Sequence, residues 1–307
     1  MPIEKIFLTG GTGFFGKSIL DMLKNGFRKD SEFVILSRDP EKFLRKYPEY
    51  AELCNVRFVA GDVRDFPFFE EKFDSIIHAA TPAVTTLQPG EMRSIIIDGT
   101  EHVLSFARFC GAKKILFTSS GAVYGPLPPG MTCVSEDFSC NPVTEYGIAK
   151  LEAEKMCLSS GISTRIARCF AFTGPRLNLD IHFAIGNFIR NGLDHKDIII
   201  KGDGTPFRSY LYADDLVRWL FAIYDCDIEN AVFNVGSPEG ISIADLARKI
   251  SAHFTPSPQV KVLGTPVPGA PPQIYVPDVE KIQKTLGVVM ENNLQQSIEK
   301  TIFSHLA

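Results

Sequence analysis

The chain has 307 residues, 45% of them apolar and 22% charged, which is the composition of a globular protein with enough length for a large core. Its net charge of −4 argues against nucleic acid or an acidic membrane as partner, and no apolar run reaches the roughly 18 residues that would span a bilayer. Seven scattered cysteines, with neither metal-ligand spacing nor a signal-peptide layout before them, predict reduced thiols, no metal site and a cytoplasmic location.

The first half of the chain alternates short apolar runs with helical patterns. Apolar runs that end in turn residues predict buried strands at residues 5–9, 33–36, 56–60, 75–78 and 114–117. Apolar residues at helical spacing predict helices over residues 15–25 and about 91–110. Strands separated by helices indicate parallel strands covered on both faces, and right-handed crossovers then give an α/β fold with a doubly wound parallel sheet.

A glycine-rich turn, Thr9-Gly-Gly-Thr-Gly-Phe-Phe-Gly16, joins the first predicted strand to the first helix. Gly10, Gly13 and Gly16 permit a tight turn, close approach of a pyrophosphate and close packing of helix on strand. The N–H groups at the start of the helix can then bind phosphate. A plain turn is the alternative, but the placement predicts a dinucleotide site, which also includes Thr12, Phe14 and Phe15.

The residues after the second strand bear on the choice of cofactor. An acidic residue there usually bonds the adenosine ribose, whereas an arginine accommodates a 2′-phosphate. Here the strand is followed by Ser37, Arg38 and Asp39. Ser37 and Arg38 favour NADP(H), although Asp39 keeps NAD(H) as an alternative, and a solvated turn is another.

Six further blocks follow in order along the chain. They are Gly61-Asp-Val63, His78-Ala-Ala80, Thr118-Ser-Ser-Gly-Ala-Val-Tyr-Gly125, Tyr146-x-x-x-Lys150, Arg168-Cys-Phe-Ala-Phe-Thr-Gly-Pro175 and Gly202-Asp-Gly-Thr-Pro-Phe-Arg-Ser-Tyr-Leu-Tyr-Ala-Asp214. With the glycine turn, they make the chain resemble the extended short-chain dehydrogenase/reductases, a group of NAD(P)-dependent nucleotide-sugar epimerases, dehydratases and reductases. The resemblance covers nearly the whole chain. Each block alone is weak, whereas the ordered set is specific.

The resemblance implies a catalytic role for Tyr146 and Lys150. A phenol has a pKa of about 10, and a nearby cation or an oxidised nicotinamide ring favours the phenolate. Residues four apart share one face of a helix, so Lys150 lies beside Tyr146 and can also reach the nicotinamide ribose. Tyr146 would then protonate a carbonyl oxygen. The family's serine, which is Ser120 by alignment on Val123-Tyr-Gly125, bonds the same oxygen. An exposed helix pair is the alternative for Tyr146 and Lys150.

Other roles are implied by the resemblance alone. Cofactor contacts are expected from residues at the strand ends and in the catalytic helix, which are Asp62, Val63, Ala79, Ala80, Thr81, Thr118, Tyr146, Lys150, Cys169 and Phe170. Substrate contacts are expected from Ser120, Tyr146, Ala171 and Arg208. The arginine would bind the substrate diphosphate, because its planar charged fork suits phosphate oxygens. The alternatives are a strand-end cap for the aspartate, close packing for the alanines and a surface ion pair for the arginine.

Departures from the family pattern bear on the activity. Sugar 4,6-dehydratases place Asp-Glu after the serine, and uronic acid decarboxylases place a glutamate just after it, whereas this chain has Gly121 and Ala122. Neither residue exchanges protons, so both activities are set aside and hydride chemistry at a carbonyl or alcohol remains. Ala171 replaces an asparagine that usually reaches the diphosphate, and residues 264–272 lack the late arginine that usually joins Arg208.

The C-terminal portion carries more proline and glycine and has shorter elements. Helices are predicted over residues 181–191, 243–253 and 291–303, with a strand at 232–235. We therefore expect a dinucleotide-binding Rossmann domain at 1–172, to which 208–235 returns, and a smaller C-terminal α/β substrate-binding lobe at 173–207 and 236–307.

These features favour an NADP(H)-dependent reductase of a nucleotide-linked 4-ketosugar, with the hydride from the nicotinamide and the proton from Tyr146. An NAD-dependent nucleotide-sugar 4-epimerase is the first alternative, and a non-catalytic redox-sensing dinucleotide-binding protein is the second. Because the family commonly pairs the helices near 91–110 and after Tyr146 across a two-fold axis, a homodimer is expected. The apolar residues consistent with that interface, or equally with the chain's own sheet, are Val103, Leu104, Ala107, Leu151 and Met156.

Overall fold

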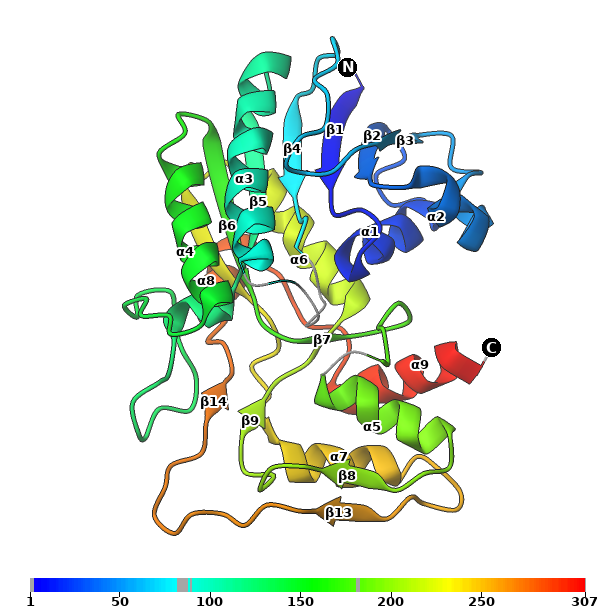
Figure 1. The fold of residues 1–307 in the computed structure, drawn as a ribbon, viewed down its shortest axis with the longest axis vertical. Helices are drawn as coiled ribbons and strands as arrows, with labels where there is room; N and C mark the ends of the chain where they lie inside the picture. Colours follow the sequence, from blue (N-terminus) through cyan, green and yellow to red (C-terminus); the bar gives the residue numbers. More distant parts are fainter. Residues whose placement is uncertain (1–2, 82–87, 89, 181–182, 307) are drawn as a thin grey trace. The chain divides into compact units, whose positions relative to one another are not determined.

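The computed structural model describes residues 3–81, 88, 90–180 and 183–306, and the chain forms two compact units (Figure 1). The first comprises Met1–Val123, Pro142–Arg168 and Leu220–Phe233, and the second comprises Tyr124–Asn141, Cys169–Trp219 and Asn234–Ala307. The chain thus returns to the first unit over residues 220–233, while the loop 124–141 belongs to the second unit. The predicted division into a dinucleotide domain and a substrate lobe stays a prediction.

The first unit is built on a seven-stranded sheet in the order β11-β6-β5-β4-β1-β2-β3. Its strands are β1 Glu4–Thr9, β2 Ser31–Ser37, β3 Val56–Ala60, β4 Ser75–His78, β5 Lys114–Ser120, β6 Ser163–Cys169 and β11 Ala231–Val235. β1 pairs in parallel with β2 on one side and with β4 on the other, so the strand order reverses between β1 and β4. Ligands of such sheets bind at the carboxyl edge of this reversal. The predicted doubly wound parallel sheet is confirmed.

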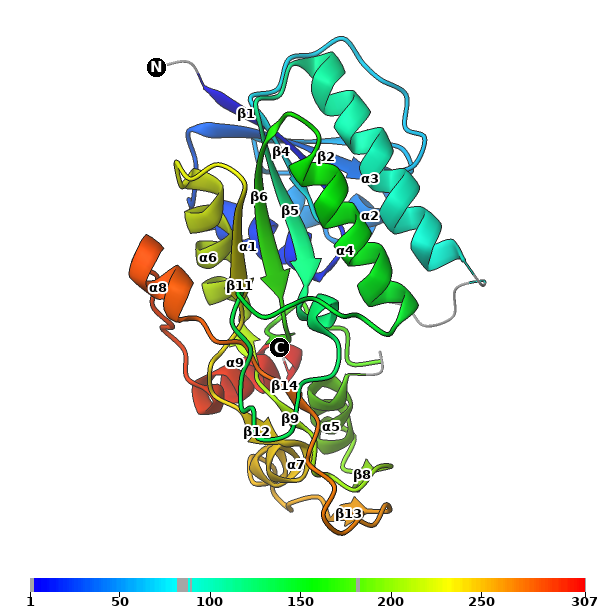
Figure 2. The same cartoon turned by 90° about the vertical axis from the view of Figure 1, so that its left-hand side faces the viewer.

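Helices cover both faces of this sheet. They are α1 Phe14–Lys24, α2 Pro40–Lys46, α3 Glu91–Cys110 and α4 Glu145–Leu158, with 3₁₀ turns η1 at Pro48–Tyr50 and η2 at Gly121–Tyr124. The helix α6 Ala213–Asp225 belongs to the first unit from Leu220 onward. Figure 2 shows α3 and α4 side by side on one face, with α1 on the other. Aromatic side chains gather around Phe7 of β1, whose ring centroid lies 4.9 Å from that of Phe106 in α3 and 5.5 Å from that of Phe66. No helix in the described residues is long and apolar enough to cross a membrane.

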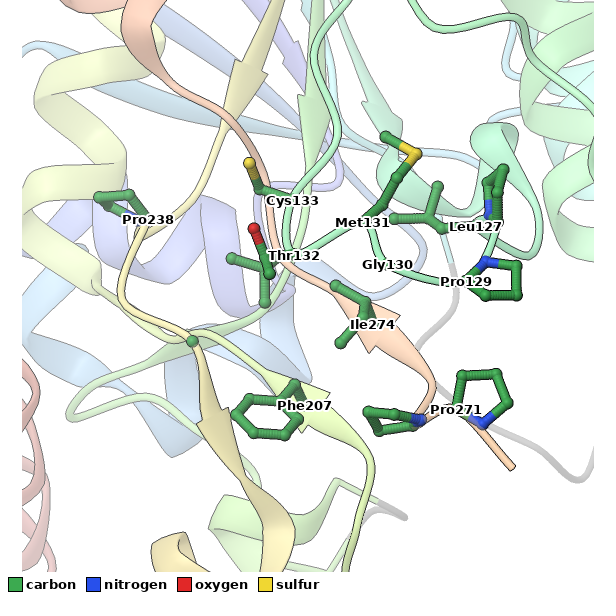
Figure 3. A pocket seen from close by; sticks show the side chains of 14 residues that line it. Leu127, Pro129, Gly130, Met131, Thr132, Cys133, Phe207, Pro238, Pro271 and Ile274 are labelled. Carbon is green, nitrogen blue, oxygen red and sulfur yellow. The ribbon is translucent and has the colours of Figure 1, made fainter. Parts of the chain in front are cut away.

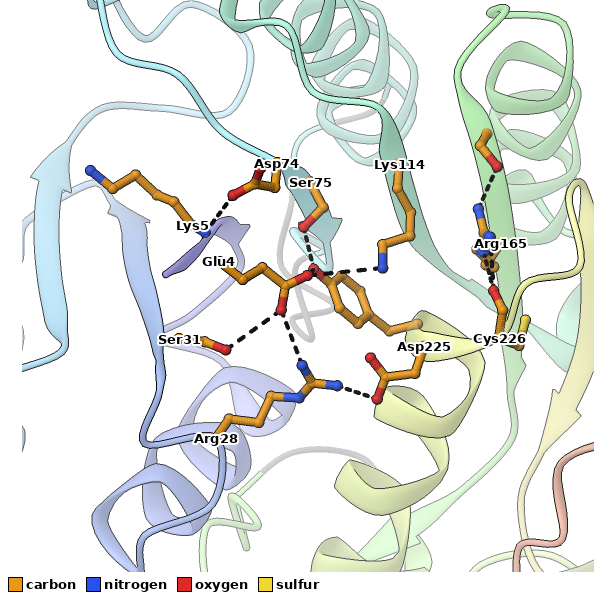
Figure 4. A network of polar contacts seen from close by, with 12 residues as sticks. Glu4, Lys5, Arg28, Ser31, Asp74, Ser75, Lys114, Arg165, Asp225 and Cys226 are labelled. Atoms are coloured by element: carbon orange, nitrogen blue, oxygen red, sulfur yellow. Dashed lines mark hydrogen bonds and ion pairs between the residues drawn. The ribbon is translucent and has the colours of Figure 1, made fainter. Parts of the chain in front are cut away.

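A polar cluster at the amino end of β1 fastens the returning segment to the first unit (Figure 4). The Glu4 carboxylate accepts hydrogen bonds from the Tyr224 hydroxyl at 2.5 Å and from Arg28 Nη1 at 3.1 Å. Arg28 also pairs with Asp225, and its guanidinium lies 4.7 Å from the Phe221 ring centroid. This cluster marks the amino edge of the sheet, whereas the glycine turn follows the carboxyl end of β1.

The second unit contains three small sheets in its described residues. β9 Phe207–Arg208 lies between β12 Ile241–Ser242 and β14 Ile274–Tyr275, β7 Phe172–Thr173 pairs with β10 Leu211–Tyr212, and β8 Ile198–Ile200 pairs with β13 Val260–Val262. Its other helices are α5 Ala184–Leu193, α7 Ile243–Ser251, α8 Glu280–Leu286 and α9 Leu294–Leu306. Because each strand has two or three residues, loops and helices make up most of this unit.

Asn234, buried in the second unit, joins segments that lie far apart in the sequence. Its Oδ1 accepts from the Tyr124 hydroxyl at 2.7 Å, and its Nδ2 donates to the carbonyls of Val134 at 2.9 Å and Asp278 at 3.1 Å. Its backbone N–H donates to the Glu136 carboxylate at 2.7 Å. A buried amide is stable only when its hydrogen bonds are satisfied in this way, so the network fixes the loop 124–141 within the second unit.

Candidate active site

The glycine turn shows which of its glycines the fold itself requires. Gly10 has a φ of +76°, and a Cβ built on it would lie 2.3 Å from the Ala79 carbonyl oxygen. A Cβ on Gly16 would lie 2.2 Å from the Gly11 Cα. Gly13 differs, because it is exposed and the nearest atom to its Cβ position, the Gly10 oxygen, is 3.3 Å away. The chain's own packing therefore excludes a side chain at Gly10 and Gly16. At Gly13 a Cβ would meet only one atom, at a slightly short distance, and the exposed backbone there is the expected place for a pyrophosphate.

The first turn of α1 is suited to an anion. Gly13 caps the helix without a side-chain hydrogen bond, and no acidic residue lies in the first turn of this fully described helix. The N–H groups that a helix start leaves unpaired and the positive end of the helix dipole both favour phosphate. Thr12, Phe14 and Phe15, the other predicted cofactor residues here, are half-buried. The turn and helix start therefore fit a dinucleotide pyrophosphate.

At the end of β2, the exposed side chain of Arg38 is followed by Asp39, whose carboxylate caps the next helix. Ser37 is buried, and its Oγ accepts from the Asp39 N–H at 3.3 Å. Asp39 caps α2, where its Oδ1 accepts from the Lys42 N–H at 2.9 Å. Arg38 is exposed. Helix capping thus engages Asp39 Oδ1, while an exposed carboxylate has acceptor capacity beyond one such bond, so NAD(H) stays an alternative.

Asp62 and Val63, which follow β3, have partners within the chain. The Arg64 guanidinium donates to both carboxylate oxygens of Asp62, at 2.8 and 3.1 Å. These hydrogen bonds, with a smaller contribution from the charge of Arg38, hold the pKa of the Asp62 carboxyl below its usual range. Val63 is buried against α3, where a Cβ on Gly99 would lie 2.9 Å from Val63 Cγ1. Asp62 therefore stays ionised and fixed in orientation.

His78, the last residue of β4, is buried, and sequence reasoning assigned it no role. Thr100 Oγ1 donates to the Ile96 carbonyl at 2.5 Å, so it accepts from His78 Nε2 at 3.1 Å. His78 Nδ1 then accepts from Thr9 Oγ1 at 2.7 Å, and Thr9 Oγ1 accepts from the Ala80 N–H at 3.3 Å. Burial lowers the pKa of His78 to about 3, so the ring is neutral at ordinary pH. This chain of bonds fixes the backbone after β4, where the predicted contacts of Ala79, Ala80 and Thr81 begin.

The predicted catalytic residues come from adjoining elements. Ser120 ends β5, and its Oγ accepts from the Ala122 N–H at 3.1 Å. Tyr146 lies in the first turn of α4, which Thr144 caps by accepting from the Gly147 N–H at 3.1 Å. A Cβ on Gly147 would lie 2.6 Å from the Ala122 carbonyl oxygen. The start of α4 therefore rests directly on the turn after Ser120, which brings Tyr146 and Ser120 to the same end of the sheet.

Lys150 is buried one helical turn after Tyr146. Its Nζ donates to the Thr118 carbonyl at 2.8 Å and to Thr81 Oγ1 at 2.7 Å. It also lies 4.7 Å from the Phe117 ring centroid. Lys150 is therefore not part of an exposed helix pair, which was the alternative interpretation of the sequence. Both contacts of Nζ are oxygen acceptors of a kind that suits an ammonium group, and the influence of Lys150 on the Tyr146 phenol stays a prediction.

Four predicted residues lie in the second unit. Cys169 ends β6 and is buried, and Phe170 and Ala171 follow it. Arg208 of β9 is half-buried, and its guanidinium carbon lies 5.7 Å from the Tyr275 ring centroid. These residues stay candidates for cofactor and substrate contacts.

The second unit also holds a pocket of about 490 Å3 (Figure 3). It is lined by residues 127–133 and by Phe207, Pro238, Gly240, Pro271, Pro272, Ile274 and Val276. Neighbouring residues of a strand point to opposite faces, so Arg208 points away from the face on which Phe207 lines the pocket. No charged side chain is among these described lining residues, and the pocket therefore lacks the charge that a diphosphate requires.

Sequence reasoning also missed a buried ion pair between α4, which carries the predicted catalytic residues Tyr146 and Lys150, and β6. Arg168 of β6 donates from Nε to Glu154 Oε1 at 3.1 Å and from Nη2 to Glu154 Oε2 at 2.8 Å. The available signal was spacing, because Glu154 of α4 follows Tyr146 by eight residues and Lys150 by four. Residues at these intervals lie along one stripe of a helix.

Comparison with known proteins identifies the family of the chain. Residues 6–236 match the NAD dependent epimerase/dehydratase family. UDP-glucuronic acid decarboxylase 6 of Arabidopsis thaliana is 30% identical in an alignment that covers 92% of this chain and 83% of the relative. The chain therefore belongs to the NAD-dependent epimerase/dehydratase family, and the predicted class of enzyme, an extended short-chain dehydrogenase/reductase, is confirmed.

Solved structures share the fold at lower identity. MoeE5 in complex with UDP-glucose and NAD is 22% identical, with a TM-score of 0.83 and 98% of each chain covered. UDP-N-acetylglucosamine 4-epimerase from Methanobrevibacter ruminantium, in complex with UDP-N-acetylmuramic acid, is also 22% identical. It has a TM-score of 0.86 and covers 100% of this chain and 99% of its own. These likenesses confirm the predicted Rossmann fold.

Proposed function

We propose that the chain is an NADP(H)-dependent reductase that converts the carbonyl of a nucleotide-linked 4-ketosugar to an alcohol. The observation that carries this proposal is the set of Ser120, Tyr146 and Lys150 followed by Gly121 and Ala122 at the end of β5. A tyrosine and a serine beside a buried cation suffice for hydride chemistry at a carbonyl. Elimination of water or loss of carbon dioxide needs a further group that exchanges protons. Decarboxylases are among the relatives, but this chain lacks the glutamate expected of them.

In this reaction a bound NADPH supplies the hydride. Tyr146 donates its hydroxyl proton to the carbonyl oxygen, and the Ser120 hydroxyl donates a hydrogen bond to the same oxygen. Lys150 stays charged beside them and favours the phenolate that Tyr146 becomes. Arg38 is a partner for the 2′-phosphate, and Gly13 with the start of α1 is the cradle for the pyrophosphate.

Arg208 is the proposed contact for the substrate diphosphate. A guanidinium is always charged and offers a planar fork to two phosphate oxygens. With Ala171 in place of an asparagine, this contact carries a larger share of diphosphate binding than in the family pattern. The substrate is accordingly a nucleotide sugar, the kind of ligand with which MoeE5 was solved.

The second candidate is a nucleotide-sugar 4-epimerase. One observation favours it, because MoeE5 and a dTDP-glucose 4,6-dehydratase from Bacillus anthracis are neighbours solved with NAD. An epimerase reduces and reoxidises its cofactor within each turnover, so it can hold NAD throughout and gains nothing from NADPH. A redox-sensing binding protein ranks third, because a sensor does not need Ser120, Tyr146 and Lys150 together.

The test is to incubate the purified chain with NADPH and a panel of nucleotide-linked 4-ketosugars while following the absorbance of NADPH. Consumption of NADPH with formation of the matching alcohol supports the reductase. Interconversion of a nucleotide sugar with its 4-epimer, without added cofactor, would establish the epimerase instead. Cofactor binding without turnover in either assay would favour the sensor.

A further inference from the structure

The ion pair between Glu154 and Arg168 is almost completely withdrawn from water. Glu154 is 2% exposed and Arg168 is 8% exposed. Two parallel hydrogen bonds join the guanidinium to both carboxylate oxygens, at 3.1 and 2.8 Å, which fixes the orientation of each side chain. Both residues lie in the first unit, on α4 and β6. The catalytic roles assigned above use neither of them.

Glu154 is also tied to the catalytic strand. The Ser119 hydroxyl donates to Glu154 Oε1, and Ser119 is 3% exposed. One residue earlier, the Thr118 carbonyl accepts from Lys150 Nζ at 2.8 Å. Two charged side chains of α4 thus hold two consecutive residues of β5. The next residue of that strand is Ser120.

A contribution to stability alone does not explain why the chain has a buried ion pair at this position. Taking two charges out of water is costly, and apolar side chains of similar size are often at least as stabilising. What a buried, doubly bonded pair does supply is a fixed geometry. Here that geometry is imposed next to a hydroxyl whose placement decides turnover, and catalysis tolerates little misplacement of such a group.

We propose that Glu154, oriented by Arg168, is a positioning residue for the reaction. Its hydrogen bond with Ser119 fixes the end of β5. It thereby fixes the position of the Ser120 hydroxyl relative to Tyr146, which lies on α4 together with Glu154. The inference rests on the proposed function, because that function gives Ser120 and Tyr146 their roles. The contrasting view is that the pair only stabilises the packing of α4 on the sheet.

The sharpest variant is Ser119→Ala, because it removes the link to the strand and leaves Glu154 paired with Arg168. We expect kcat to fall about tenfold, with little change in KM or in NADPH affinity, and a lower midpoint of thermal unfolding because a buried carboxylate loses one hydrogen bond. Ser119→Thr keeps a hydroxyl and should restore kcat. Ser297→Ala is the matched control, since Ser297 is equally buried and its Oγ donates to the Asn293 carbonyl at 2.8 Å, in the second unit. It should leave kcat unchanged.

A second measurement needs no substrate. The Ala122 N–H donates to Ser120 Oγ, so its hydrogen exchange reports how firmly the end of β5 is held. Exchange in the segment 118–124 should be faster in Ser119→Ala than in the parent and in Ser297→Ala. Unchanged exchange together with unchanged kcat would overturn the proposal. If the parent reduces no ketosugar, the proposed function fails, while the exchange result still decides whether Glu154 positions the strand.

Discussion

Tyr146 is the residue on which turnover should depend most directly. Tyr146→Phe removes the hydroxyl that gives up the proton and keeps the ring at the start of α4. We expect kcat to fall at least about 100-fold, the scale for a lost general acid, with NADPH affinity and thermal unfolding unchanged. NADPH oxidation with an active ketosugar measures this. Tyr47→Phe, a half-buried tyrosine elsewhere in the first unit, is the control, and near-normal turnover of Tyr146→Phe would remove its assigned role.

Arg38 should decide between the two nicotinamide cofactors. A charge-assisted hydrogen bond to the 2′-phosphate contributes about 1.5–3 kcal/mol, which corresponds to roughly 10- to 150-fold in affinity. We expect NADPH to bind at least about tenfold tighter than NADH, and Arg38→Ala to remove most of that preference. Fluorescence titration with both cofactors tests this, with the exposed Arg45→Ala as a control of equal charge change. Equal affinities in the parent, or NAD that copurifies at full occupancy, would place the epimerase first.

His78 should make the stability of the fold sensitive to acid. Its pKa is about 3 in the folded chain against an ordinary value of 6.5, so between these values the unfolded chain binds one more proton. Stability is therefore lost as pH falls through this window, by up to about 1.4 kcal/mol per pH unit from this group. His78→Asn should show a shallower decline of unfolding free energy in urea between about pH 6 and 4. The exposed His195→Asn should keep the parent slope, and equal slopes in all three proteins would contradict the prediction.

Short motifs made much of the candidate site predictable at the level of residues. Local spacing selected Gly10 and Gly13, and the family resemblance selected Ser120, Tyr146 and Lys150. The structure places the elements that carry them at one edge of one sheet. The partners that orient them were not predictable. His78, for example, depends on hydroxyls from two other elements, and no local pattern in the sequence reports such contacts.

At the scale of elements, apolar periodicity located the central strands but not every helix. The predicted strand at 5–9 corresponds to β1, and the helix predicted at 91–110 corresponds to α3. The α2 helix was not predicted, although an aspartate cap and a proline at its first position mark its start. The strands of the second unit have two or three residues, too few to show any period.

Tertiary contacts shifted the boundaries of other helices. The helix predicted at 291–303 begins at Leu294, because buried Asp215 accepts the N–H of Glu291 at 3.3 Å and of Asn292 at 3.1 Å. The helix predicted at 181–191 corresponds to α5, and its residues 181 and 182 lie outside the described residues. A prediction from local sequence does not include a hydrogen bond from a side chain such as Asp215, which is distant in the sequence.

The capping role of Asp39 gives a prediction at this scale. Asp39→Ala removes the N-cap of α2 and should lower the free energy of unfolding by about 1 kcal/mol, whereas Asp39→Asn keeps a good cap and should cost less. Neither change should alter the ratio of NADPH to NADH affinity. Urea denaturation and cofactor titration test the two statements. A selective loss of NADH binding in Asp39→Asn would show instead that the carboxylate binds ribose.

At the scale of the whole molecule, the predicted homodimer now rests on the family resemblance. Val103, Leu104 and Ala107 are buried in the core of the first unit, so they support the interpretation in which they face the chain's own sheet. Leu151 is half-buried, and Ile148 on α4 is exposed. We expect light scattering at micromolar concentration to give twice the chain mass, and Ile148→Lys to shift that mass toward the monomer. A monomeric parent would refute the dimer.

The way the chain passes between its two units has a consequence for biosynthesis. The first unit takes residues from three separate stretches, the last of which is Leu220–Phe233. The bond between Glu4 and Tyr224 joins residues that are 220 positions apart. A ribosome that adds about 5–20 residues per second needs roughly 10 to 40 s to make that interval. The Glu4 carboxylate therefore stays without Tyr224 during that interval, and β1 gains its full set of contacts only after the segment 220–233 has been synthesised.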